Sequence, residues 1–211
     1  MTCDVPCWWG AIPGTTTIDE IKHTISPYNF ETYEYEGEGE GDVYLFSGLG
    51  YTEESGFSTR IVYGFSDGIL IGITARIPSA TDFLAEYGQP DEIWVSAMNS
   101  PREMSPIIWF TIVYLQKDMG INYIVDGDIQ SDVMAGCIAD ETTDQLPLLN
   151  MMIPENSTHY TDFTGGIFDK ERRYIPLEEA TGLTIEEFVQ FFSNPSQSQC
   201  FETPMELWEY E

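Results

Sequence analysis

STRIVYGFSDGILIGITARI, residues 58–77, is the stretch from which the fold can be read. Apolar and β-branched residues lie on both sides of a central Ser66-Asp67-Gly68. An Asp-Gly pair readily takes the positive φ angles that a tight hairpin turn requires. The segment therefore predicts two antiparallel strands joined by a short turn.

The segments around this hairpin predict further strands. They alternate in polarity or are rich in β-forming residues, and they cover residues 31–49, 91–98, 106–115, 120–127 and 133–140. Lys117-Asp118-Met119-Gly120 is a turn sequence between two of them. Short turns between successive strands indicate antiparallel pairing.

Three segments predict helices, at residues 16–25, 77–90 and 183–192. Each begins with a hydroxyl residue followed three positions later by an acid, which resembles a capping box: Thr17 and Glu20, Ser79 and Asp82, Thr184 and Glu187. Gly88 and Pro90 are expected to end the second helix, and Asn194-Pro195 the third.

This order of elements predicts an α+β fold with antiparallel β-sheet and helices packed on one face. We expect a single domain over residues 1–211. Ile-Pro pairs precede the first two helices, which suggests two degenerate helix-meander half-repeats at 12–76 and 77–140. Residues 141–211 then form a C-terminal covering segment with helical character, in which 146–154 is a cover or an edge strand.

The charge of the chain excludes some partners. There are 36 acidic and 8 basic residues, for a formal net charge of −28. Nucleic acid is not an expected partner, because phosphate contacts need Lys and Arg. Residues 31–54 carry eight acids and no basic residue, which indicates either a solvated face or a weak site for calcium or for a basic partner. No apolar run reaches the roughly 18 residues of a transmembrane segment.

Four cysteines, Cys3, Cys7, Cys137 and Cys200, are candidates for two disulfides in an oxidising compartment. Three connectivities are open, and reduced buried thiols are the alternative. The spacing fits no zinc site, and no cofactor is expected. The chain begins directly with MTCDVPC, as a chain would from which an export signal had been removed.

Three short motifs carry a resemblance. They are Cys3 to Cys7 followed by Trp8, Trp9, Gly10, Pro13 and Gly14; Gly88 and Pro90 followed by Ile93 and Trp94; and Cys200 followed by Thr203, Pro204, Leu207 and Trp208. The chain is similar in these motifs to exported bacterial proteins, many of them lipoproteins, that have no assigned activity. The resemblance implies an extracellular or cell-envelope location. It also implies that Cys3 would be unavailable for a disulfide if it carried a lipid tether.

A looser resemblance is to small outer-membrane lipoproteins of the SmpA/OmlA type and to β-lactamase-inhibitor-like proteins. Their repeating unit is a capped helix, a Gly-x-Pro and an antiparallel meander. Residues 13–16 and 87–90 look like parts of that unit, although Ser26-Pro27 stands where the first Gly-x-Pro would be.

Four tryptophans, three of them near the ends of the chain, are interpreted as structural anchors. These are Trp8, Trp9, Trp94 and Trp208. Burial of such a ring contributes about 2–3 kcal/mol, and a disulfide about 2–4 kcal/mol. We therefore expect both termini to be tied to the core, with a sugar- or peptide-binding aromatic platform as the alternative.

No residue pattern in the sequence indicates a particular catalysed reaction. The two histidines, His23 and His159, have no catalytic motif around them. Asp126, Asp128 and Asp132 alternate as calcium ligands do, but Ser131 and Cys137 stand where an EF-hand needs Gly and Glu. The sequence favours an exported, acidic, non-catalytic binding or assembly module with a protein partner. An extracellular hydrolase with paired carboxylates and a calcium-binding surface protein are the alternatives.

Overall fold

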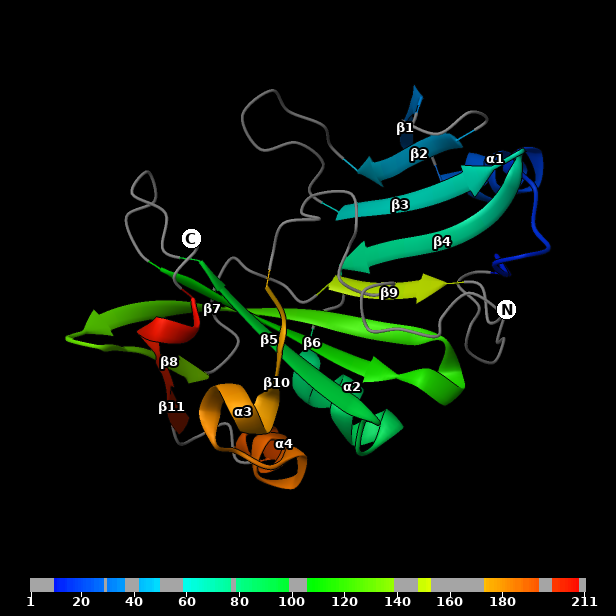
Figure 1. Cartoon of the computed structure of the whole chain (residues 1–211). Helices are drawn as coiled ribbons and strands as arrows, with labels where there is room; N and C mark the ends of the chain where they lie inside the picture. The colour runs from blue at the N-terminus through cyan, green and yellow to red at the C-terminus, as the bar shows by residue number, and fades with distance from the viewer. Residues whose placement is uncertain are drawn as a thin grey trace. The chain divides into compact units, whose positions relative to one another are not determined.

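The structure is a computed structural model that describes residues 10–28, 30–36, 42–49, 59–76, 79–98, 106–138, 148–152, 173–193 and 199–208. The chain divides into two compact units (Figure 1). Unit 1 comprises residues 1–76, 115–120 and 148–163, and unit 2 comprises 77–114, 121–147 and 164–211. A single domain with half-repeats stays a prediction.

Unit 1 is a five-stranded antiparallel sheet with the order β1-β2-β3-β4-β9. Its strands are β1 (Glu31–Glu36), β2 (Asp42–Leu49), β3 (Thr59–Ser66), β4 (Ile69–Arg76) and β9 (Leu148–Met152). Its helical elements are α1 (Ile18–Ile25), η1 (Ser26–Tyr28) and η2 (Leu115–Lys117).

The hairpin predicted at residues 58–77 is confirmed as β3 and β4. Asp67 and Gly68 form the turn with φ angles of 50° and 78°. The backbone before α1 runs along this hairpin: Gly14 N–H donates to Leu70 O at 2.7 Å, and Leu70 N–H donates to Thr16 O at 2.8 Å. The hairpin therefore fixes the point at which α1 begins.

The core of unit 1 lies on one face of its sheet. Leu45, Tyr63 and Ile73 are neighbours across β2, β3 and β4, and all three are buried. Ile21 and Ile25 of α1 are buried as well, four residues apart on one face of the helix. Burial raises the pKa of Tyr63 to about 12, so its hydroxyl stays protonated in this core.

Unit 2 is a six-stranded sheet with the order β10-β5-β6-β7-β8-β11. Its strands are β5 (Glu92–Met98), β6 (Ile107–Tyr114), β7 (Met119–Gln130), β8 (Val133–Ile138), β10 (Ile175–Pro176) and β11 (Gln199–Pro204). Its helices are α2 (Ala80–Tyr87), α3 (Leu177–Thr181), α4 (Ile185–Ser193) and η4 (Met205–Leu207). The first two residues of β7 belong to unit 1.

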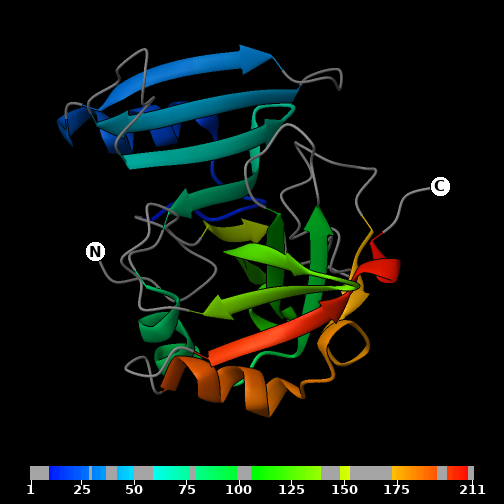
Figure 2. The ribbon, with the colours of Figure 1, turned by 90° about the vertical axis from the view of Figure 1, so that its left-hand side faces the viewer.

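Aromatic rings join the helices of unit 2 to its sheet, and Figure 2 shows α4 lying along β11. Phe188 of α4 packs on Phe110 of β6 at 4.8 Å between ring centroids, and Phe110 also packs on Phe201 of β11 at 5.0 Å. Tyr114 of β6 donates from its hydroxyl to Gly88 O, just after α2, at 2.7 Å. The predicted α+β fold, an antiparallel sheet with helices on one face, is confirmed.

The helix starts predicted at Thr17 and Thr184 are confirmed in detail. Thr184 N–H donates to Glu187 Oε2 at 2.9 Å, and Glu187 N–H donates to Thr184 Oγ1 at 3.2 Å. The same reciprocal pair joins Thr17 and Glu20. At α2, Ser79 Oγ accepts from Asp82 N–H at 3.0 Å, and the helix ends at Gly88 with φ of 76°.

We predict that the stabilising effect of the Glu187 carboxylate depends on pH. The backbone and hydroxyl of Thr184 donate to it and hold the pKa of Glu187 below its usual value of 4.5. A depressed folded-state pKa contributes stability that is complete above the unfolded pKa and lost as the pH falls through the folded one. Glu187→Gln should therefore be less stable than wild type at pH 7, and the gap should close below about pH 4.

Urea denaturation of both proteins at several pH values measures this gap. Comparing the difference in their free energies of unfolding from one pH to another cancels the effect of the large net charge, which both proteins share. A gap that is constant from pH 7 to pH 3 would show that the carboxylate charge has no part in the cap.

Two regions differ from the sequence expectation. The strand predicted at residues 120–127 is longer, because β7 continues to Gln130 and turns tightly at Ser131, whose φ is 63°. The C-terminal segment contains the helix predicted at 183–192 as α4, and the strand β9 lies within 146–154, where a strand was one of two alternatives; the strands β10 and β11 are additional. These strands are short and pair only with residues far away in the sequence, so local periodicity does not reveal them.

We predict that Gly136→Ala destabilises the protein by about 1–3 kcal/mol through overpacking. A Cβ atom at Gly136 of β8 would lie 2.7 Å from Cζ of Phe201 and 3.1 Å from Cδ1 of Ile108. Phe201 is held in the aromatic core and cannot move away freely. Thermal or urea unfolding measures the loss.

Gly64→Ala is the matched control. A Cβ atom there would lie 3.4 Å from Cε1 of Tyr44, an ordinary van der Waals contact. Equal losses in the two variants would mean that the close approach of Phe201 does not matter.

Candidate functional site

The most exposed regular element of unit 1 is the strand β1, whose sequence is ETYEYE. All six of its residues are exposed, so neither of its faces is buried. It stands at the end of the strand order, with β2 as its neighbour among the described strands. Tyr33 and Tyr35 are exposed to 62% and 55%. Large exposed aromatic side chains beside each other are typical of interaction surfaces.

The two faces of β1 carry different chemistry. Register places Glu34 beside Leu45, on the face of the sheet that forms the core. There Lys22 of α1 reaches Glu34, with Nζ and Oε1 2.7 Å apart. Tyr33 and Tyr35 therefore lie on the opposite face, because side chains alternate along a strand.

The tyrosine face continues onto β2 and β3. Tyr35 lies directly opposite Tyr44 of β2, and Tyr44 lies opposite Gly64 of β3. The ring of Tyr44 extends over Gly64, which has no side chain in its way. The surface formed by Tyr33, Tyr35 and Tyr44, with Glu31, Glu34 and Glu36 interleaved along β1, is called the β1 edge below.

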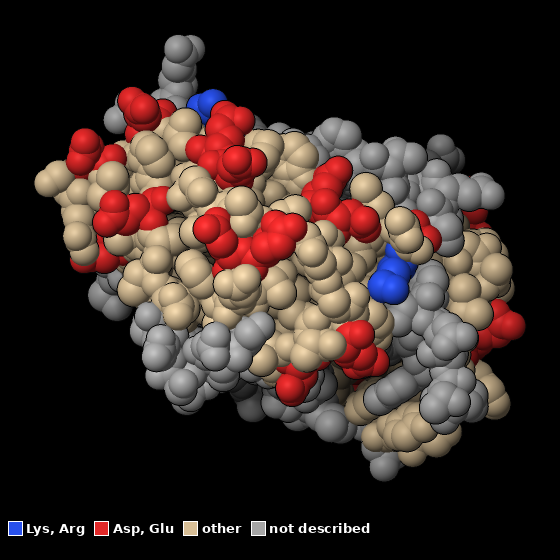
Figure 3. Space-filling view, turned by 90° about the horizontal axis from the view of Figure 1, so that it is seen from below, with Lys and Arg blue, Asp and Glu red and all other residues tan. Residues whose placement is uncertain are grey.

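Negative charge is not confined to the β1 edge. Figure 3 shows carboxylate groups in several separate clusters over the face that it displays. Three of the described glutamates, Glu20, Glu186 and Glu187, have pKa values lowered by hydrogen bonds to backbone or side-chain donors. The general acid of a paired-carboxylate hydrolase needs a raised pKa, so these three do not supply it.

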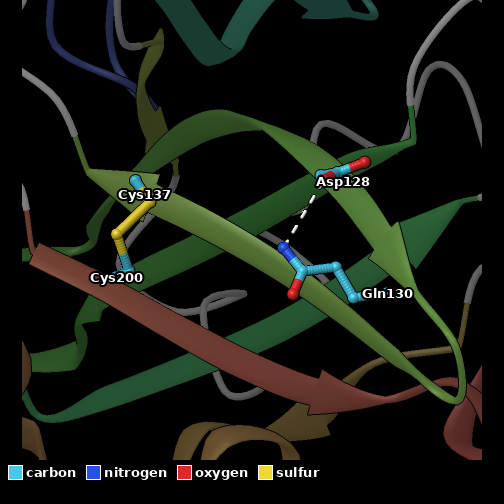
Figure 4. Close-up of a disulfide and its surroundings, with 4 residues drawn as sticks. All are labelled: Asp128, Gln130, Cys137 and Cys200. Atoms are coloured by element: carbon cyan, nitrogen blue, oxygen red, sulfur yellow. Dashed lines mark hydrogen bonds between the residues drawn. A yellow bond between two sulfur atoms is a disulfide. The ribbon is translucent and has the colours of Figure 1, made fainter.

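A disulfide joins Cys137 of β8 to Cys200 of β11, so this pairing is shown (Figure 4). The two residues are directly opposite in the strand register, and their Cα atoms are 4.0 Å apart. Both are exposed. Cys3 and Cys7, the other two candidates, lie outside the described residues.

The three aspartates considered for calcium all lie at the exposed end of the β7–β8 hairpin. Asp126 and Asp128 alternate on β7, and Asp132 is in the turn. Gln130 Nε2 donates to Asp128 Oδ2 at 3.5 Å. Within the described part of the chain, no group of three or more His, Cys, Asp or Glu side chains is placed to hold a metal ion. The calcium site stays a prediction.

The tryptophans considered as anchors differ in burial. Trp208, after η4, is buried, and its Nε1 donates to Thr203 Oγ1 at 3.0 Å. Trp94 of β5 is half-buried, and its Nε1 donates to Glu92 Oε2 at 2.8 Å. Trp8 and Trp9 lie outside the described residues, so their role as anchors stays a prediction.

Sequence reasoning identified the acidic run at residues 31–54 but did not single out its tyrosines. Of the two histidines, His23 is exposed on α1 and His159 lies outside the described residues. The available signal for the β1 edge was the alternation of Glu, Tyr and Thr in residues 31–36. Alternation predicts a strand with one buried face, whereas here both faces are exposed.

Comparison with known proteins gives no match to a family model, to a curated protein or to a solved structure. Of the helices in the described ranges, none combines the length and apolar character needed to cross a membrane.

Proposed function

We propose that this protein is a non-catalytic binding module of the cell envelope or the extracellular space, and that it contacts a protein partner through the β1 edge. The observation that carries the proposal is the exposure of all six residues of β1, including two largely exposed tyrosines. Burial of such rings is a main source of affinity in protein interfaces.

The location outside the cytosol is supported by the Cys137–Cys200 disulfide. Disulfides persist in oxidising compartments and are rare where thiols are kept reduced. The resemblance of three short motifs to those of exported proteins supports this location and is compatible with a lipid tether at Cys3. Non-reducing mass spectrometry of protein from its native source tests both, because it reports disulfide, lipid and terminal processing together.

A photo-crosslinking amino acid at Tyr35 tests the binding function. The variant is expressed in the native source, irradiated and analysed for adducts of higher mass. Adducts are expected from position 35 and not from position 202, where Glu202 is exposed on β11 of the other unit. Equal yields at the two positions, or none at position 35, would contradict the proposal.

A further inference from the structure

We infer that the β1 edge binds an extended basic segment of another protein, which adds to the sheet of unit 1 as a further strand. This inference rests on the proposed function and specifies its partner. Addition of a strand to a sheet edge is a recurrent mode of peptide recognition, in which the backbone supplies affinity and the side chains supply specificity.

The backbone of β1 provides the first element of this site. β1 is paired along all six residues with β2, from Glu31 opposite Gly48 to Glu36 opposite Val43. A strand paired on one side directs alternate N–H and C=O groups to the other side, where they match those of an incoming strand. Six residues of regular pairing make this template long enough for about three ladder hydrogen bonds.

The side chains of β1 provide the second element. An added strand would present alternate residues to the two faces of the sheet. One row would meet Tyr33 and Tyr35, and the other would meet Glu34 and Glu36. Arginine suits both rows, because its guanidinium group stacks on aromatic rings and also pairs with carboxylates.

Charge decides among the possible occupants of the edge. Glu31, Glu34 and Glu36 lie on β1, and Lys22 pairs with Glu34. A second copy of β1 would bring three more carboxylates against these three, and like charges across neighbouring strands destabilise pairing. A segment with Arg or Lys at alternate positions reverses the sign of that interaction. The edge therefore rejects its own copy and accepts a basic strand.

The probe is an acetylated and amidated octapeptide, (Arg-Thr)4, whose binding is measured by calorimetry at two salt concentrations. A second peptide has the same sequence with every backbone nitrogen methylated, so that it keeps the charge and loses its hydrogen-bond donors. The unmodified peptide is expected to bind at least about tenfold more tightly, since it can donate ladder hydrogen bonds that the methylated peptide cannot. Binding should also slow hydrogen exchange of β1 amides.

Matched variants locate the site. Glu31→Gln with Glu36→Gln should weaken binding of the (Arg-Thr)4 peptide about threefold or more. Glu178→Gln with Glu179→Gln removes the same charge from exposed positions on α3 and should leave binding unchanged. Tyr33→Ser with Tyr35→Ser keeps the charge and should also weaken binding. All of these side chains are exposed, and circular dichroism verifies that each variant folds.

Three outcomes would overturn the inference. The first is equal binding of the methylated and unmodified peptides, which would show attraction by net charge alone. The second is equal weakening by the β1 and α3 charge variants. The third is dimerisation of the wild-type protein that Tyr33→Ser with Tyr35→Ser abolishes, which would make a second copy the occupant. If crosslinks form at position 35 in the native source but the (Arg-Thr)4 peptide does not bind, the proposed binding function is retained and strand addition is rejected.

Discussion

Trp208→Ala is expected to lower the free energy of unfolding by about 3–5 kcal/mol, the range for removal of a buried Trp or Phe side chain. Trp208 is only 5% exposed although it lies close to the end of the chain. Chain ends usually fray unless they are tied down. The loss should appear in urea unfolding and as faster hydrogen exchange of the β11 amides.

Two neighbouring bonds explain why the ring matters to unit 2. The backbone N–H of Met205, in the turn before Trp208, donates to Asp132 O at 2.9 Å. Arg173 Nη1 donates to Leu207 O at 3.0 Å. Loss of the indole would free this turn from β8 and β11 together.

Trp208→Phe tests the contribution of the hydrogen bond separately from that of the apolar area of the ring. It keeps most of the apolar area but leaves Thr203, which is fully buried, without the donor at its Oγ1. We expect a cost of about 1–3 kcal/mol for this variant. Glu206→Ala, exposed on the same turn, is the control and should change stability by less than about 0.5 kcal/mol. A decrease of less than about 1 kcal/mol in the free energy of unfolding of Trp208→Ala would refute the role of Trp208 as a structural anchor.

Removal of the Cys137–Cys200 disulfide is expected to cost about 4 kcal/mol. The two cysteines are 63 residues apart in the sequence, so the bond closes a long loop and removes much freedom from the unfolded chain. The double variant Cys137→Ala with Cys200→Ala tests this by urea unfolding. Single variants would leave a free thiol and are less informative.

Reduction provides a second measurement on the unchanged sequence. Because both cysteines are exposed, a thiol reductant can reach the bond without unfolding of the protein. The reduced protein and the double variant should lose the same stability. The exposed Glu202→Ala on the same strand is the control. A loss below about 1 kcal/mol on both routes would mean that pairing of β8 with β11 alone constrains the chain.

The local features of the fold could be read from the sequence. The hairpin turn at Asp67-Gly68 and the caps at Thr17 and Thr184 each depend on residues within four positions of one another. Interactions of this range depend mainly on residue type and spacing, so the sequence is enough to predict them. The length of β7 was underestimated, because its last residues are polar and are held by pairing with β8.

The candidate site could be predicted only in part. The acidic run in residues 31–54 indicated a basic partner as one alternative. That Tyr33 and Tyr35 are exposed could not be read from ETYEYE, since the same alternation fits an edge strand and a half-buried strand. Exposure depends on which strand takes the end position in the sheet.

The sequence by itself determined the α+β class, the helices at 16–25, 77–90 and 183–192 and the hairpins, because these follow from turn chemistry, capping and short-range periodicity. Tertiary structure alone decided that Cys137 faces Cys200, that β11 pairs with β8 and that β1 stands at an edge. Each of these joins or separates segments far apart in the chain. Their partners are selected by the packing of the whole unit, and no local pattern encodes that choice.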